Sequence, residues 1–199
     1  QNQFPVDVFQ TGSGTSTNMN VNEVLANLAK RNSVVDVHPN DDVNLGQSSN
    51  DVIPTAIQVS AARRIRRKLL PALANLRATI QRKAEAYTDV VKTGRTHLMD
   101  AMPLTLSQEL LTWDAQLEQA EQRLEAILPQ LYSLPQGGTA IGTGINADSQ
   151  FAGLFCQSMA NFTELPFTSA ENKFAGIAGQ DVAVATAGIM SSVATVMME

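Results

Sequence analysis

The chain has 199 residues and a formal net charge of −5, and 44% of its residues are hydrophobic while only 5% are aromatic. This length allows one domain with a buried core, and the acidic balance without a basic stripe argues against nucleic-acid binding. The single cysteine, Cys156, excludes an internal disulfide and is typical of a reducing compartment.

The surface and the ends of the chain carry further information. Charged residues make up 17% of the chain, below the usual quarter, which predicts that partner subunits cover part of the surface. The apolar stretch 182–198 is short and contains Ser and Thr, so we expect a buried helix and no membrane span. No signal peptide is recognisable, so we expect a cytoplasmic protein, or a mitochondrial one if a presequence is missing. The abrupt start and end predict a piece of a longer protein.

Hydroxyl-bearing residues and glycines precede the first expected helix, which covers residues 18–31. Ser13 and Thr15 lie in this run, where exposed backbone amides beside a helix N-terminus form a suitable anion site. The alternative is an ordinary capping loop. Residues 31–47 are expected to be irregular, because His38-Pro-Asn-Asp has turn chemistry.

A long helix is expected from Ser48 or Ser49, one of which caps it, to about Tyr87. Apolar residues recur at steps of three or four positions between Ile57 and Ala84. The basic cluster at 63–68 is expected to face solvent or another helix rather than a ligand.

A polar connection, Lys92–Thr105, follows this helix and contains His97. A loop held by rigid helices is suited to present side chains in a cleft, which makes Arg95, Thr96, His97 and Asp100 candidates for a site. The alternative is a helix–helix connector whose polar residues cap the next helix near Thr105.

The clearest periodicity lies in the next helix, expected over residues 105–132. Its apolar positions from Leu106 to Leu131 alternate steps of four and three, which is a heptad seam. Such helices pack lengthwise in bundles, and we expect Trp113 and the methionines in the core. A glycine-rich loop at 135–146 indicates close backbone approach, and further helices are expected over 149–161 and from about 172.

Together these patterns predict an all-α fold, a long-helix bundle with a loop-rich N-terminal head that ends near residue 47. The two histidines are far apart in sequence and no cysteine pair exists, so we expect no metal site. Polar loops adjoin three helix starts, at 13–18, 48–50 and 95–97. If these loops meet at one end of the bundle, they offer hydroxyl and amide donors and one imidazole, which suits a small dicarboxylate.

Five segments resemble the class II fumarases of the fumarase/aspartase superfamily: Gly14–Glu23, His38–Asn44, Gln47–Asp51, Gly94–Pro103 and Leu134–Asn146. The resemblance implies the helical-bundle fold of that superfamily. Residues 1–47 would be the C-terminal part of an N-terminal domain, and 48–199 part of the central helical domain. It also implies a carbon–oxygen lyase of the tricarboxylic acid cycle, which interconverts fumarate and (S)-malate without a cofactor. Such an enzyme would be a homotetramer in which each active site takes loops from three subunits.

The resemblance further implies roles for single residues. His97 matches the catalytic histidine that handles the water, and Asn18 matches a polar residue near the pocket. A second anion site falls on His38, Pro39, Asn40 and Asp41. The substrate-binding positions fall on Ser13, Gly14, Thr15, Ser48, Ser49, Asn50 and Thr96.

One departure from the family pattern limits the expectation. The family's loop with a catalytic serine and a carboxylate-binding lysine is absent, so we expect these 199 residues alone to lack hydratase activity. Two alternatives remain: an aspartate ammonia-lyase, where glutamine usually replaces His97, and a non-catalytic helical assembly module like the lens delta-crystallins.

Overall fold

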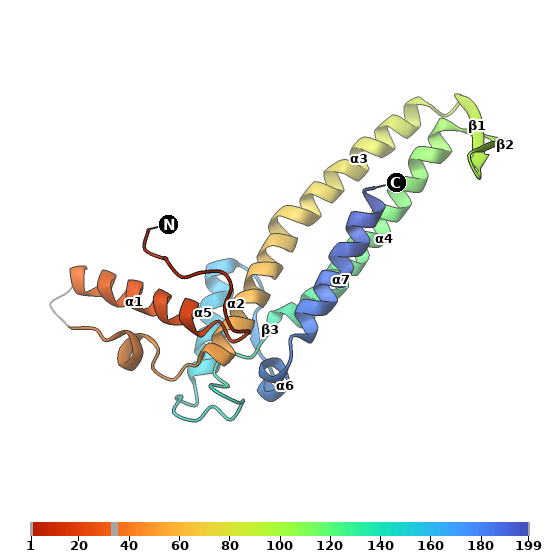
Figure 1. The fold of residues 1–199 in the computed structure, drawn as a ribbon. Coiled ribbons are helices and arrows are strands. Elements are labelled where there is room, and N and C mark those ends of the chain that lie inside the picture. Colours follow the sequence, from red (N-terminus) through yellow and green to blue (C-terminus); the bar gives the residue numbers. More distant parts are fainter. Residues whose placement is uncertain (1, 33–35, 199) are drawn as a thin grey trace. The chain divides into compact units, whose positions relative to one another are not determined.

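The computed structural model describes residues 2–32 and 36–198 and divides the chain into two compact units (Figure 1). The first unit contains Gln1–Ala61 and Gln130–Ala183, and the second contains Ala62–Pro129 and Val184–Glu199. Each unit is a group of residues that contact one another more than they contact the rest of the chain. The domain boundary expected at residue 47 stays a prediction.

The first unit contains short and medium-length helices joined by long loops. Its elements are α1 (Thr15–Asn32), the π-helical turn η1 (Pro39–Val43), most of α2 (Ser49–Arg64), β3 (Ser133–Leu134), α5 (Phe151–Thr163), β4 (Thr168–Ser169) and α6 (Lys173–Ala178). Strands β3 and β4 pair in parallel. The helices expected over 18–31 and 149–161 are therefore present with shifted ends, and the segment expected to be irregular contains one helical turn.

The second unit consists of long helices and one hairpin. Its elements are η2 (Ile65–Leu69), α3 (Leu70–Ala86), β1 (Val91–Thr96), β2 (Met99–Thr105), most of α4 (Leu106–Tyr132) and most of α7 (Asp181–Val196). Helix α4 lies along both α3 and α7 (Figure 1). The prediction of an all-α fold of long helices is confirmed, with short strands added.

The long helix expected up to Tyr87 is interrupted by a π-helical turn at Ile65–Leu69, which sequence analysis missed. The N–H of Leu70 donates to the carbonyl of Ile65, five residues earlier. Pro71 follows at once, and its ring excludes the normal bond to the carbonyl four residues before it. The local widening accommodates this proline, as π turns do inside α-helices.

The single helix expected from about residue 172 is two helices. Gly179 takes an extended conformation after α6, and α7 begins two residues later. Asn172 caps α6 through its side-chain oxygen, which accepts from the N–H of Ala175 at 3.2 Å.

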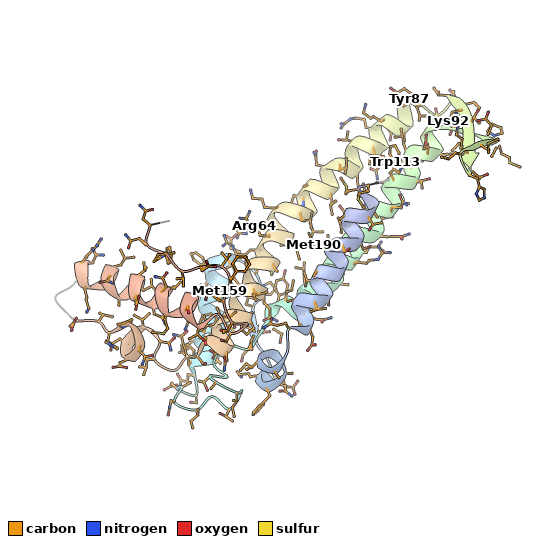
Figure 2. All side chains as sticks on the ribbon, viewed as in Figure 1. Arg64, Tyr87, Lys92, Trp113, Met159 and Met190 are labelled. Atoms are coloured by element: carbon orange, nitrogen blue, oxygen red, sulfur yellow. The ribbon has the colours of Figure 1, made fainter. Side chains whose placement is uncertain are left out.

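The core of the second unit follows the predicted heptad seam of α4 only from Leu117 onward. Leu117, Ala120 and Leu124 are buried, but Trp113 is 38% exposed. Met190 on α7 is also exposed, and Figure 2 labels both side chains. Met99, Met102, Met197 and Met198 are exposed as well, whereas Met19 and Met159 are half-buried. The expectation that Trp113 and the methionines lie in the core was therefore wrong for this chain.

Arg77 on α3 makes three hydrogen bonds to α4. Its guanidinium donates to Asp114 at 2.8 Å, to Glu121 at 2.6 Å and to Glu118 at 3.0 Å. These hydrogen bonds raise the pKa of Arg77 further above its usual range. Burial pushes the pKa of Asp114 upward, but hydrogen bonds from Arg77 and Gln81 outweigh it and leave that pKa below its usual value. The basic residues of the cluster at 63–68 are all exposed, as predicted.

Candidate functional site

Four hydroxyl groups form a continuous row in the first unit, called here the hydroxyl row. The row runs from Thr11 to Ser13 at 3.0 Å, from Ser13 to Thr15 at 3.0 Å, and from Thr15 to Ser49 at 3.1 Å. It therefore joins the loop before α1 to the start of α2. Thr15 is the first residue of α1 and Ser49 is the first residue of α2. Two helix N-termini, each a partial positive charge, meet at one hydrogen bond.

Gly14 gives the loop its shape. It has a φ of +58°, and its N–H donates to the carbonyl of Thr11 at 2.9 Å. Its own carbonyl accepts from Asn18 at 3.0 Å and so starts α1. A Cβ at this position would lie 2.8 Å from Cδ1 of Ile53 on α2. Glycine lets the loop approach α2 closely enough for the hydroxyl row to form.

Helix α2 begins with a reciprocal cap between Ser48 and Asp51. The Ser48 hydroxyl accepts from the N–H of Asn50 at 3.2 Å, and the Ser48 N–H donates to Oδ1 of Asp51 at 3.0 Å. This arrangement corresponds to a capping box with an acid at the third helical position. The prediction that Ser48 or Ser49 caps this helix is confirmed, with Ser48 in the role.

The other oxygen of Asp51 holds the glycine-rich loop, and sequence analysis missed this residue as part of a candidate site. Oδ2 accepts from the N–H groups of Gly137 at 3.0 Å and Thr139 at 2.8 Å. Burial raises the pKa of Asp51, against the opposing effect of the backbone N–H groups. The spacing Ser48-x-x-Asp51 could have predicted the capping box, but it gives no indication that Asp51 also binds the glycine-rich loop.

Amide side chains surround the same turn. Asn50 donates from Nδ2 to the carbonyl of Ala140 at 2.8 Å. Asn18 and Asn22, one turn apart on α1, both donate to Oδ1 of Asn44, at 3.1 and 3.0 Å. Asn44 in turn donates to the carbonyl of Gln47 at 3.3 Å. Asn18 is buried and bonded within this network, so the network fixes the segment that leads into Ser48.

A cleft of about 460 Å³ lies beside this turn in the first unit. It is bordered by η1 and the segment after it on one side and by the glycine-rich loop on the other. Asn40, Asp41, Ser48 and Thr139 are among its lining residues. The cleft therefore brings two residues of the expected second anion site close to one expected substrate-binding serine.

The turn η1 contains the residues expected to form that second anion site. His38 caps it, with Nδ1 accepting from the N–H of Asp41 at 3.1 Å, and its own N–H donates to Asp42 at 2.7 Å. Asn40 donates to Asp41 at 3.1 Å. The role of His38, Pro39, Asn40 and Asp41 stays a prediction.

The connection predicted between residues 92 and 105 is a β-hairpin rather than a loop, which corrects the expectation. Strands β1 and β2 are antiparallel with a register shift between Thr93 and Arg95. The turn consists of His97 and Leu98, with φ values of 51° and 62°. Two successive positive φ values define a type I′ turn, and a leucine rarely adopts this conformation. The hairpin has the backbone strain that is common at functional sites.

The polar side chains near the tip of the hairpin are exposed to solvent. Thr96 and His97 are exposed at its tip. Arg95 lies 3.5 Å from Asp100 across the strands, and Lys92 donates to Glu109 on α4 at 2.6 Å. Figure 2 shows Lys92 near Tyr87, at the end of α3 from which the hairpin projects. A cleft of about 570 Å³, lined in part by Lys92 and Thr96, lies along the hairpin.

Helix α4 begins directly after the hairpin with a second capping box. Thr105 accepts from the N–H of Gln108 at 3.2 Å, and the Gln108 side chain accepts from the N–H of Thr105 at 2.9 Å. The prediction that polar residues near Thr105 cap this helix is confirmed. The cap fixes the hairpin's second strand to a long helix.

The expected site residues thus fall in two places. The first unit holds Ser13, Gly14, Thr15, Asn18, His38, Pro39, Asn40, Asp41, Ser48, Ser49 and Asn50, and the second holds Thr96 and His97. The structure brings Ser13, Thr15 and Ser49 together directly. Among residues 2–32 and 36–198, no group of three or more His, Cys, Asp and Glu side chains could hold a metal ion.

A family model described as Lyase matches residues 1–199. The chain belongs to this lyase family. This match and the relatives of the chain confirm the resemblance inferred from the sequence motifs.

The relatives of this lyase-family chain include several class II fumarate hydratases. The one from Xylella fastidiosa is 54% identical over 197 residues, covering 99% of this chain and 42% of the relative. The "fumarate hydratase class II 2" of Pseudomonas aeruginosa is 55% identical, covering 98% of this chain and 43% of the relative. The chain therefore spans less than half the length of the curated relatives it matches.

Solved structures agree with this similarity. The class II fumarase from Schistosoma mansoni superposes with a TM-score of 0.94 at 42% identity, covering 100% of this chain and 46% of that one. A "fumarate lyase:delta crystallin from Brucella melitensis bound to cobalt" gives 0.88 at 36% identity, covering 98% and 44%. The bundle of the lyase-family chain is thus that of the fumarase superfamily. No helix in the described ranges is long and apolar enough to span a membrane.

Proposed function

We propose that the complete protein that carries this chain is a fumarate hydratase, a carbon–oxygen lyase that adds water reversibly to fumarate to give (S)-malate. The observation that carries the proposal is the hydroxyl row from Ser13 through Thr15 to Ser49 at two helix starts. The names of the relatives at 54% and 55% identity support the same reaction. The substrate class is a small dicarboxylate.

The hydroxyl row suits the hardest part of this reaction. Loss or gain of a proton next to a carboxylate passes through an aci-carboxylate with two negative charges on its oxygens. Hydroxyl and amide donors aimed at those oxygens stabilise them, and removal of one such donor costs roughly 3–4 kcal/mol in comparable sites. Ser13, Thr15, Ser49 and Asn50 are the proposed donors. The N-termini of α1 and α2 add favourable partial charge.

We assign the proton transfer to and from the reacting water to His97. In hydration, the imidazole accepts a proton from water as the hydroxyl bonds to one alkene carbon. In the reverse direction the imidazolium protonates the leaving hydroxide. Histidine is suited to both roles near neutral pH. The exposed, positive-φ position of His97 beside Thr96 supports a side chain that is presented to a site.

A second group must remove or add the proton on the substrate carbon, and we assign this role to residues outside this chain. The 199 residues contain no Gly-Ser-Ser sequence followed by a lysine in the family pattern. The chain alone is therefore proposed to be inactive.

A homotetramer with active sites built from several subunits would bring His97 to the hydroxyl row of another subunit. Exposed apolar side chains support such assembly, among them Trp113 and Leu111 on α4 and Val184 on α7.

The test is an assay of the purified complete protein with fumarate and, separately, with aspartate. The proposal predicts formation of (S)-malate and no release of ammonia from aspartate. Ammonia release without hydration would favour the aspartate ammonia-lyase. Absence of both activities in a folded, assembled protein would favour the helical assembly module. Because no cofactor is proposed, treatment with a chelator is expected to leave the rate unchanged.

A further inference from the structure

Asp51 is a buried carboxylate that joins two segments more than eighty residues apart in sequence, and the proposed chemistry does not use it. Its side chain is completely buried, with 0% exposure. Oδ1 accepts from the backbone of Ser48, and Oδ2 accepts from Gly137 and Thr139. Within the described ranges, the structure gives no ion pair between Asp51 and a basic side chain.

A carboxylate in this position is costly unless its oxygens are fully hydrogen-bonded. The reciprocal cap with Ser48 uses only Oδ1 of Asp51 and so requires only one acceptor oxygen. Here both oxygens are used, and each faces backbone N–H groups of a different segment. An amide of the same shape has only one acceptor oxygen and would present an NH2 group to donors on one side. An aspartate at position 51 is therefore better explained by hydrogen bonds to two segments than by capping of α2 alone.

The backbone of Thr139 supports the same interpretation. Thr139 has a φ of +58°, although β-branched residues strongly disfavour that region. Such conformations persist when the surrounding structure over-determines them. The 2.8 Å bond to Asp51 is one such determinant. The next residue, Ala140, accepts from the side chain of Asn50 at 2.8 Å, which makes a second tie between the same two segments.

We propose that Asp51 is a positioning residue, which fixes the turn Ser48–Asn50 against the glycine-rich loop so that Ser49 and Asn50 face a bound dicarboxylate. This proposal rests on the proposed function. With Asp51 in place, one N–H of the Asn50 amide is held by Ala140 and the other stays available to a ligand oxygen. Without it, the loop that orients Asn50 loses two of its backbone bonds.

The experiment compares the complete protein with its Asp51→Asn variant by hydrogen–deuterium exchange and steady-state kinetics. We expect exchange at Gly137 and Thr139 to accelerate by about tenfold or more, since hydrogen bonds to a charged group each contribute that much. We also expect kcat for fumarate to fall by about tenfold or more with a smaller change in KM, because misaligned donors act mainly on the transition state.

Asp181→Asn is the matched control, since Asp181 is also a first-turn carboxylate in the first unit but is exposed. It is expected to leave both readouts unchanged. If Asp51→Asn does not fold, Asp51→Ser provides the second variant, because serine is tolerated at helix starts and introduces no opposing NH2 group.

The outcomes are separable. Unchanged exchange in the glycine-rich loop would show that Asp51 does not hold this loop, which overturns the proposal. Faster exchange with an unchanged kcat would show that Asp51 has only a structural role, which overturns its positioning role. If the unsubstituted protein does not hydrate fumarate, the proposed function fails and the positioning role falls with it. The exchange data then still decide whether Asp51 holds the loop.

Discussion

Thr139 donates its backbone N–H to Oδ2 of Asp51 over 2.8 Å while its φ is +58°. The bond therefore holds a β-branched residue in a conformation that costs roughly 1–2 kcal/mol for residues with a Cβ. A favourable contact to a buried carboxylate and an unfavourable backbone conformation are combined at one residue. The same residue lines the cleft beside Ser48.

A pair of substitutions tests this strain. Because glycine has no Cβ, Thr139→Gly is expected to be more stable than Thr139→Ala by about 1 kcal/mol, the reverse of the usual order. Both variants keep the N–H that donates to Asp51. Urea unfolding of the two purified variants measures the difference, and a more stable alanine variant would contradict the assignment of strain to this position.

Gly14 is predicted to be intolerant of a side chain. Gly14→Ala places a Cβ 2.8 Å from Cδ1 of Ile53 at a positive φ, and it is expected to lower the free energy of unfolding by roughly 1–3 kcal/mol. Gly12→Ala in the same loop is the control, because no atom lies within 4 Å of a Cβ there. Equal losses of stability in the two variants would argue against close packing of this loop on α2.

The acid sensitivity of the second unit is predicted to depend on Asp114. Although burial pushes its pKa upward, hydrogen bonds from Arg77 and Gln81 outweigh this effect and hold its pKa in the folded protein below the usual value of an aspartate. Its ion pair with Arg77 therefore stabilises the fold above the pKa of an unfolded aspartate, and this stabilisation is lost as the pH falls through the lower pKa of the folded protein. Asp114→Asn is expected to flatten this part of the stability–pH curve and to cost roughly 1.5–3 kcal/mol at neutral pH. The exposed Asp89→Asn provides the charge-matched control, measured by urea unfolding at several pH values, and an equal slope change there would refute the assignment.

Cys156 is predicted to be unreactive in the folded protein. The thiol is 3% exposed on α5, and burial raises its pKa, partly opposed by Lys173. Since the thiolate is the reactive form, thiol labelling at neutral pH is expected to be much slower in the native state than in urea. Equal rates in the two states would show that α5 opens readily.

The sequence was sufficient where one local pattern determines the structure. Helix α4 begins and ends within one residue of the prediction, because its heptad seam is long and the Thr105–Gln108 cap marks its start. The hairpin was missed because its turn is His97-Leu98 rather than Asn-Gly, the usual signal for a type I′ turn. The double role of Asp51 was missed because Gly137 and Thr139 lie far away in sequence. Trp113 fits a core pattern, but a helix pattern cannot tell which neighbour covers a face.

The central claim is that His97 transfers the proton of water. The most direct measurement is kcat for fumarate hydration by the complete protein and by its His97→Asn variant, with assembly checked by light scattering. Since a positioned acid–base group contributes about 10²–10⁴-fold to a rate, we predict a fall in kcat of at least about a hundredfold in a correctly assembled variant. A variant that assembles normally and keeps the unsubstituted kcat would contradict the account.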